Sequence, residues 1–404
     1  MIDASIRSAV DELAALERGS ATDGEARAAA LLVEMFAERG LAAEIEHEQA
    51  VGDYWRTSGF AAAAAAGAGL LARRSRLAAT ALAGSAAAVI ADDVDCGGHA
   101  FRRLLPKRTA ANVLAWAGDP AATRTIVLAA HHDAARTGLL FHPGLVPAVA
   151  RAAPGFYARQ TTSTQTGKLL VTGPLLVAVG SALGLRRLRR FGVFWSAVTA
   201  ALLADVARSP LVPGANDNLS SVAVLLALAR GFAERPPAGV RVLLLSTGSE
   251  ESFMEGMRGF VARHRAELDP AQTTFVALEC LGSPHLAILE GEGMLRMRDY
   301  DAALRDELQA AADAAGEPVW RGLRLGAGAS DALPALKAGY RAACLAAVTD
   351  LKTPANYHWP SDVPANLSWE TIDAAARLVD GLVRGAAGAA QDVSAAAISS
   401  NART

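Results

Sequence analysis

The stretch VRVLLLSTGSEES, residues 240–252, decides the fold of this chain. It begins as an apolar run of strand length and ends in two adjacent carboxylates, Glu250 and Glu251. A continuous apolar run bounded by turn residues is typical of a strand that is buried on both faces of a sheet. In such sheets, ligands bind in the loops that leave the carboxyl ends of strands. We therefore expect the two glutamates to lie at a ligand-binding edge of the sheet.

Similar runs alternate with helical patterns along most of the chain. Strands are predicted over residues 43–49, 112–116, 125–130, 240–246, 274–280, 285–290 and 342–348. Helices are predicted over residues 3–18, 23–39, 219–234, 254–265, 299–315, 331–338 and 370–386. This alternation indicates the α/β class, with a three-layer α/β/α sandwich around a mixed, largely parallel central sheet.

The composition narrows the possible functions. Of 404 residues, 52% are hydrophobic and 20% are charged, which favours a sizeable core over disorder. A net charge of −2 without a basic tail or stripe gives no indication of a nucleic-acid partner. Cys96, Cys280 and Cys344 lie far apart, so we expect reduced thiols rather than disulfides. The first 40 residues form a charged helical pattern, and no secretory signal is expected there.

Two apolar segments interrupt the alternation. Residues 57–91 and 168–204 each read as a helical hairpin whose turn carries arginines, RRSR in the first and RRLRR in the second. The uncharged arms are 14–17 residues long, short of the roughly 20 residues that cross a bilayer. The prediction is therefore a single domain built from residues 1–56, 92–167 and 205–404, with the two hydrophobic helical hairpins as insertions.

The role of the hairpins stays open between three alternatives. They are membrane-embedded helices, a hydrophobic lid or substrate tunnel, or Ala-rich helices in a dimer interface. Membrane association is favoured, with the side of the membrane undetermined and a cytoplasmic protein as the alternative. Spanning hairpins on a cytoplasmic domain would place the arginine turns outside, against the positive-inside tendency. Shallow insertion with snorkelling arginines avoids that conflict, as does an external domain.

Polar side chains recur where other strands end or helices begin. His131 and Asp133 follow the strand at 125–130, and a carboxylate two residues away can orient the imidazole. Asp217 precedes the helix at 219–234, where a capping role is the simpler explanation. Glu279 lies inside an apolar strand, a place where glutamate is seldom buried without a partner. His358 follows in a Pro-containing loop.

Together these residues have the composition of a metal site. The set offers nitrogen and oxygen ligands, which zinc accepts. The nitrogens belong to His131 and His358, and the oxygens to Asp217, Glu251 and Glu279. Five ligands are too many for one catalytic zinc but suit two zinc ions that share one carboxylate. Glu250 is then free to act as the general base that takes a proton from water.

At these positions the sequence resembles metallopeptidase family 28. The motifs that carry the resemblance are HHDAARTG, GANDN, GSEESFMEGMRGF, ALECLG, ASDALPALKAG and YHWPSD, in the order found in that family. The resemblance covers roughly residues 22–50, 108–139 and 212–385 and leaves the hairpins outside. The family comprises co-catalytic zinc aminopeptidases, together with glutamate carboxypeptidases and glutaminyl cyclases.

The resemblance implies a role for each matching residue. His131 and Glu279 would bind the first of two zinc ions, Glu251 and His358 the second, and Asp217 would bridge them. Other divalent metals are possible. The catalytic assignments follow in one list: Glu250 as the base, Asp133 as the group that orients His131, and Tyr357 as a hydrogen-bond donor to the developing oxyanion. In the family a tyrosine elsewhere in the pocket can fill that last role.

Three features depart from the family pattern. Glu279 stands where the family usually has Asp, and the extra methylene moves the carboxylate by over an ångström. LeuSerSer at 219–221 replaces the more usual Ala-Ser-Gly. A long insertion separates His131 from Asp217, so the second hairpin starts and ends beside the expected site.

The resemblance implies a zinc-dependent aminopeptidase that acts on peptides. One rival is a glutaminyl cyclase-like acyl transferase, whose chemistry needs one zinc and no ligand at His131. Another is a non-catalytic receptor or scaffold on the same fold, which would be free to lose ligands. Substrate preference, native metal and oligomeric state are not predicted.

Overall fold

The computed structural model describes residues 1–401, with side chains described as far as Gly388. Its centre is a seven-stranded mixed sheet in the order β1-β2-β4-β3-β5-β10-β6. The inner pairs β4/β3, β3/β5 and β5/β10 are parallel, whereas β1, β2 and β6 join by antiparallel pairing. The predicted mixed, largely parallel sheet is confirmed.

The sheet strands begin and end close to the predicted positions. Their bounds are β1 Ala43–Ala50, β2 Arg108–Gly118, β3 Thr125–His131, β4 Arg241–Thr247, β5 Thr273–Glu279, β6 His285–Ile288 and β10 Arg341–Val348. A second, small sheet has the order β8-β7-β9, with bounds β7 Gly291–Glu292, β8 Arg298–Asp299 and β9 Arg324–Leu325. These two-residue strands are too short to carry an alternating pattern, and they were not predicted. Because Arg298 and Asp299 belong to β8, the helix predicted from residue 299 begins only at Ala302.

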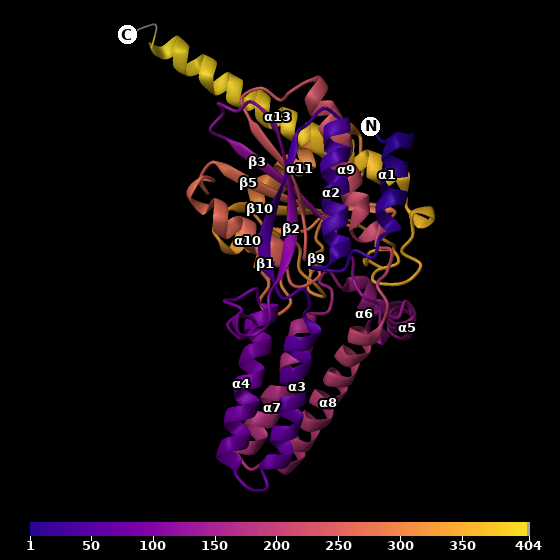
Figure 1. Cartoon of the computed structure of the whole chain (residues 1–404), viewed down its shortest axis with the longest axis vertical. Coiled ribbons are helices and arrows are strands. Elements are labelled where there is room, and N and C mark those ends of the chain that lie inside the picture. The colour runs from indigo at the N-terminus through magenta and orange to yellow at the C-terminus, as the bar shows by residue number, and fades with distance from the viewer. Residues whose placement is uncertain (402–404) are drawn as a thin grey trace.

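Helices cover both faces of the large sheet (Figure 1). On one face lie α1 Ala4–Ala14, α2 Asp23–Glu38, α9 Ser220–Glu234, α11 Ala302–Ala315 and α13 Trp369–Asn401. On the other face lie α10 Glu255–Arg263 and α12 Ala332–Lys337. Alternate residues of one strand enter opposite cores, since Leu244 packs in the first and Leu243 and Leu245 in the second. This produces the expected three layers.

The two apolar hairpins form one structural unit. Their helices are α3 Trp55–Leu71, α4 Arg76–Val94, α7 Thr166–Ala182 and α8 Arg186–Arg208. Neighbouring helices pack in the cyclic order α3, α4, α7, α8, and the four-helix bundle projects from one end of the α/β layers (Figure 1). The predicted arms are 14–17 residues long, and the helices are 17, 19, 17 and 23 residues long. The helices α4 and α8 are longer than predicted because charged residues at both of their ends continue the helix.

The segment between β3 and the second hairpin contains two short helices, α5 Leu145–Ala152 and α6 Pro154–Arg159. Before them, a single 3-10 turn at Leu139–Phe141 lies against α8. The three cysteines are free and buried, as their spacing predicts.

Candidate metal centre

The ends of three parallel strands bring the predicted residues together. His131 is the last residue of β3, Glu279 is the last residue of β5, and Glu250 and Glu251 follow the end of β4. Since parallel strands end at the same edge of a sheet, these four side chains meet there. Asp217 reaches the same edge from the turn before α9.

The Asp217 carboxylate lies between the two histidines. Its Oδ1 is 3.1 Å from Nε2 of His131, and its Oδ2 is 3.2 Å from Nε2 of His358. Glu251 Oε1 is also 3.2 Å from Nε2 of His358. On the other side, Glu250 and Glu279 place an oxygen 3.8 and 3.9 Å from Nε2 of His131. Each oxygen of Asp217 therefore faces a different imidazole.

Asp133 connects His131 to the acidic pair. Its Oδ1 is 3.4 Å from Nδ1 of His131 and accepts a hydrogen bond from the backbone N–H of Glu250 at 3.0 Å. Its Oδ2 accepts from the backbone N–H of Glu251 at 3.1 Å and from the Ser20 hydroxyl at 2.6 Å. One buried carboxylate thus fixes the imidazole and the loop after β4 together.

Glu279 is held by the residue that follows Asp217. The Asn218 side-chain amide donates to Glu279 Oε2 at 3.1 Å and to the Leu278 carbonyl at 2.8 Å. The other oxygen, Glu279 Oε1, is buried and has no hydrogen-bond partner among the described side chains. A buried carboxylate oxygen without a partner is costly, and a bound cation is one way to satisfy it.

Burial and crowding perturb the acid–base behaviour of the cluster. Burial raises the pKa of Glu250, of Glu251 and of Glu279 above the ordinary value for glutamate, and neighbouring carboxylates add to the rise. Burial opposes ionisation of Asp217 as well, but hydrogen bonds from both histidines bring its pKa below the ordinary value. Burial also opposes protonation of His358, yet Glu251 and Asp217 outweigh it and raise the pKa of His358 to about 10.

The donor set fits a borderline divalent cation. Ligand atoms of His131, Asp217 and Glu251 lie within 4.8 Å of one another, and so do those of Asp217, Glu279 and Cys280. Imidazole nitrogens and carboxylate oxygens are ligands that zinc accepts. Four carboxylates around two imidazoles leave an excess of negative charge that metal cations would neutralise. Cys280 was not among the predicted ligands, and burial among carboxylates raises the pKa of its thiol well above the ordinary value.

Tyr357 and His132 are each adjacent in sequence to a predicted histidine ligand, but their side chains lie differently from the ligands. The Tyr357 ring stacks on His358 with centroids 3.9 Å apart. His132, which follows His131, turns the other way, with Nδ1 3.0 Å from the Ser246 hydroxyl. Burial lowers the pKa of His132 to about 4, so it is a neutral buried group.

Two supporting residues could not be recognised in the sequence. Arg18 is fully buried and donates to the carbonyl oxygens of Leu13, His132 and Gly214. Asp362 accepts from the backbone N–H of Asn216 at 2.6 Å and of Asp217 at 3.1 Å. Both act on backbone far away in the sequence, so no local pattern could reveal them. Asp362 is the last residue of the YHWPSD motif, and the resemblance of that motif to the family was the signal in the sequence that pointed to it.

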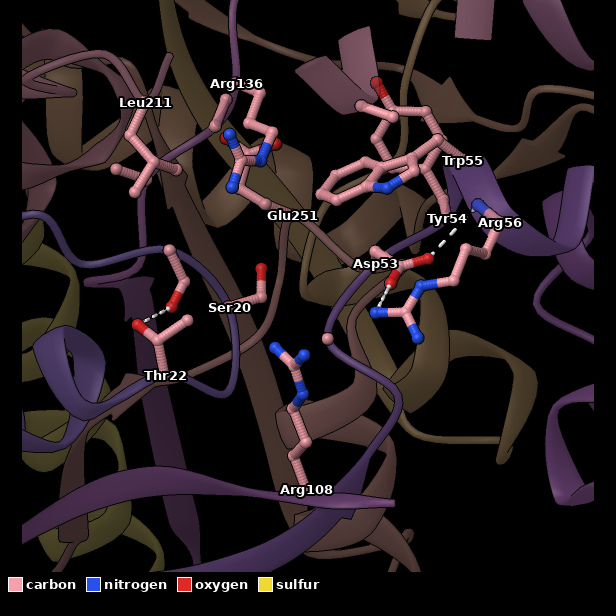
Figure 2. A pocket seen from close by; sticks show the side chains of 15 residues that line it. Ser20, Thr22, Asp53, Tyr54, Trp55, Arg56, Arg108, Arg136, Leu211 and Glu251 are labelled. Atoms are coloured by element: carbon pink, nitrogen blue, oxygen red, sulfur yellow. Dashed lines mark hydrogen bonds and ion pairs between the residues drawn. The ribbon is translucent and has the colours of Figure 1, made fainter. Parts of the chain in front are cut away.

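A cavity of about 220 Å³ adjoins Glu251 (Figure 2). Ser20, Tyr54, Trp55, Arg108 and Arg136 are among the residues that line it. The Arg136 guanidinium lies 5.5 Å from the centroid of the Trp55 ring. Because α3 begins at Trp55 and Ala207 of α8 also lines the cavity, the cavity lies where the bundle joins the α/β layers.

Comparison with solved structures supports the same fold. An aminopeptidase from Aneurinibacillus sp. strain AM-1 is 16% identical, with a TM-score of 0.53 over 95% of this chain and 93% of that chain. A zinc aminopeptidase from Bacillus subtilis is 14% identical, with a TM-score of 0.54 and 94% of each chain covered. A glutaminyl cyclase from an Acidobacteriales bacterium is 15% identical, with a TM-score of 0.51 over 94% and 92%. At these identities the similarity establishes the fold.

A search of the curated proteins found no match. The model of peptidase family M28, in contrast, matches residues 199–383, a range that includes Asp217, Glu250, Glu251, Glu279 and His358. Residues 199–383, which carry most of the site, therefore match peptidase family M28, and this match supports a hydrolase.

Proposed function

We propose that the chain is a two-zinc aminopeptidase that removes N-terminal residues from peptides. The observation that carries this proposal is the position of Asp217, whose two carboxylate oxygens face His131 and His358 at 3.1 and 3.2 Å. A carboxylate shared between two histidines is the arrangement that a bridged pair of metal ions requires. A single-metal site would not need a histidine on each side of it.

The remaining ligands divide between the two histidines. Glu279 lies on the His131 side, and Glu251 lies on the His358 side. In this assignment His131 and Glu279 would hold one zinc ion and Glu251 and His358 the other, with Asp217 shared between the two ligand sets. Zinc bound here would supply Lewis-acid chemistry to the peptide carbonyl and lower the pKa of water at the site. Asp133 keeps the His131 imidazole oriented.

Glu250 is the proposed general base. It lies beside the ligands, with Oε2 3.8 Å from His131 Nε2, and it is not needed to complete either proposed ligand set. A carboxylate in that position takes a proton from the attacking water and passes it to the leaving amine. Its backbone N–H donates to Asp133, so the same residue that orients His131 positions the base.

Tyr357 lies beside the second histidine of the site and has a proposed role of its own. Its ring lies against His358, which supports a place at the site. In this proposal Tyr357 donates to the oxyanion that develops on the peptide carbonyl. Tyr357→Phe would then lower kcat while metal binding is unchanged.

The test of the function uses a mixed peptide library, half of it N-acetylated, with and without a zinc chelator. Stepwise shortening of the free peptides alone, abolished by the chelator and restored by zinc, is the expected result. Loss of water or ammonia from N-terminal glutamine or glutamate without shortening would indicate the acyl-transfer rival instead. No change to any peptide would contradict both enzymatic functions.

Glu250→Gln tests the mechanism separately. Without a carboxylate to accept the proton, kcat is expected to fall by about 10²- to 10⁴-fold. Because Glu250 is not a proposed ligand, the bound zinc, measured by atomic emission, is expected to remain at the wild-type ratio. Unchanged turnover would refute the assignment of the base. Loss of metal would instead make Glu250 a ligand.

A further inference from the structure

The four-helix bundle has small residues inside and large apolar residues outside. The buried positions on α3 and α4 are mostly alanines, among them Ala61, Ala65, Ala68, Ala83 and Ala86. The exposed large side chains of the bundle are Phe60, Leu70, Leu71, Leu77, Leu82, Leu169, Leu175, Val179, Leu183, Leu185, Phe191, Phe194 and Val198. A bundle in water has the opposite arrangement, with large apolar side chains inside and charges outside.

Glycines let the helices of the second hairpin approach closely. A Cβ atom on Gly192 of α8 would lie 2.6 Å from the backbone nitrogen of Val177, and one on Gly173 of α7 would lie 2.8 Å from that of Ser196. Between the hairpins, a Cβ on Gly69 would collide with Val193. Small residues at helix contacts are typical of helices that associate in lipid, where packing rather than the hydrophobic effect drives association. Pro174 inside α7 is also more usual in membrane helices.

Each helix of the bundle contains a stretch without Asp, Glu, Lys, Arg or His. We call these stretches together the uncharged belt: residues 57–72, 77–91, 169–185 and 191–204. At 1.5 Å per residue, these 14 to 17 residues extend about 21–25 Å along each helix. The hydrocarbon core of a bilayer is about 30 Å thick, and snorkelling arginines or local thinning accommodates a difference of this size. The full helices α4 and α8 are long and apolar enough to cross a membrane.

The belt ends in arginines at the tip of the bundle. Both turns of the hairpins lie there, and seven arginines flank them: Arg73, Arg74, Arg76, Arg186, Arg187, Arg189 and Arg190. Arg76 at the start of α4 donates to the carbonyl oxygens of Ser181 and Ala182 at the end of α7. This contact holds the two tips at the same level, so that the arginines form one charged cap.

We propose that the bundle spans a lipid bilayer, with its arginine tip in the cytoplasm and the α/β domain on the opposite face. Arginines in short loops between membrane helices favour the cytoplasmic side, whereas large domains translocate largely regardless of charge. The bundle joins the domain at one end only, which leaves the belt free to lie in the membrane (Figure 1).

A second copy of the chain or a closing lid would not explain the same surface. Either of them would cover one face of the bundle. The exposed apolar side chains instead come from all four helices, for example Phe60 of α3, Leu82 of α4, Leu175 of α7 and Phe194 of α8. A bilayer surrounds the bundle and contacts all of these faces at once.

Cysteine accessibility tests the topology of the whole chain in a bacterial host. The native thiols of Cys96, Cys280 and Cys344 are buried, so the unaltered chain gives the background. Arg187→Cys adds an exposed thiol at the arginine tip, and Thr123→Cys adds one on the α/β domain. Spheroplasts and inverted membrane vesicles are treated with a membrane-impermeant maleimide.

The expected result is opposite labelling of the two variants. Thr123→Cys reacts in spheroplasts, and Arg187→Cys reacts only in inverted vesicles or after detergent is added. Reaction of both in the same preparation would show that the bundle does not cross the bilayer. The reverse pattern would overturn the proposed orientation. Release of the unaltered chain by carbonate washing would overturn the membrane assignment altogether.

Discussion

At the scale of single residues, the site depends on a few side chains that each contact two separate segments of the chain and hold them together. Asp133 is the clearest example, because it contacts His131 and also accepts hydrogen bonds from the backbone of Glu250 and Glu251. Partners of this kind, which hold ligands without binding metal, commonly affect metal affinity or activity by 10–100-fold. Ser20 in turn holds Asp133 from the loop before α2.

We predict that Asp133→Asn weakens zinc binding by about 10–100-fold, because an amide cannot accept all the hydrogen bonds that the carboxylate accepts. Competition with a chromogenic chelator measures this affinity. Asp350→Asn is the matched control, since the Asp350 side chain is 91% exposed and its ion pair is with His285, away from the metal centre. Equal zinc affinity in both variants would contradict a positioning role for Asp133.

Arg18 supports a second prediction at this scale. Its buried guanidinium donates to three carbonyl oxygens, including those of His132 and Gly214 beside the site. Arg18→Met leaves these acceptors buried without donors, and the free energy of unfolding is expected to fall by about 3–5 kcal/mol. Denaturant titration of the purified protein measures the change. Arg27→Met, at an exposed position of α2, should change it little, and an equal effect of both substitutions would count against the prediction.

The candidate metal ligands and the candidate base could be predicted from the sequence, whereas the residues that support them, Arg18 and Asp362, could not be derived from its periodicity. His131, Glu250, Glu251 and Glu279 follow apolar runs, so the rule that strand ends meet at one edge was enough to bring them together. Arg18 and Asp362 act through backbone atoms at positions far away in the sequence. Such contacts depend on the path of the loops, which no periodicity encodes.

At the scale of elements, strand positions were predicted within a few residues because buried strands have a continuous apolar pattern. Two of the bundle helices, α4 and α8, were predicted too short for a related reason. Their ends carry charged residues, such as Arg186 at the start of α8 and Asp205 near its end, which continue the helix although they interrupt the apolar run. Hydropathy therefore located the uncharged belt and not the full helix.

A single exposed position on this belt distinguishes a bilayer from water. Leu175 lies in the middle of α7 and is 50% exposed. In water, Leu175→Asp would cost little, whereas an aspartate at the centre of a membrane helix costs about 2.5–3.5 kcal/mol. We therefore predict a lower fraction of Leu175→Asp in the membrane pellet and faster degradation in cells, measured by immunoblot. Thr123→Asp on the α/β domain serves as the control, and equal membrane recovery of the two variants would argue that Leu175 faces water.

At the scale of the whole molecule, the metal centre and the root of the bundle occupy the same end of the α/β layers. The cavity beside Glu251 is lined by Tyr54 and Trp55, where α3 begins, and by Ala207 near the end of α8. If the bundle spans the bilayer, this cavity lies close to the membrane surface. Peptides bound to the same membrane would then meet the site at a high effective concentration.

This arrangement predicts a preference for peptides held at the membrane. The enzyme is reconstituted in liposomes and given one peptide in two forms, both with a free N-terminus, one of them joined to a lipid through its C-terminus. We expect the lipid-linked form to be hydrolysed at least about tenfold faster at equal total concentration, because tethering raises its local concentration. Dispersing the liposomes in detergent should remove most of the difference. Hydrolysis of both forms at equal rates in liposomes would contradict the membrane-facing site and leave the peptidase function intact. Hydrolysis of neither form would count against the peptidase function itself, because the soluble peptide needs no membrane to reach the metal centre.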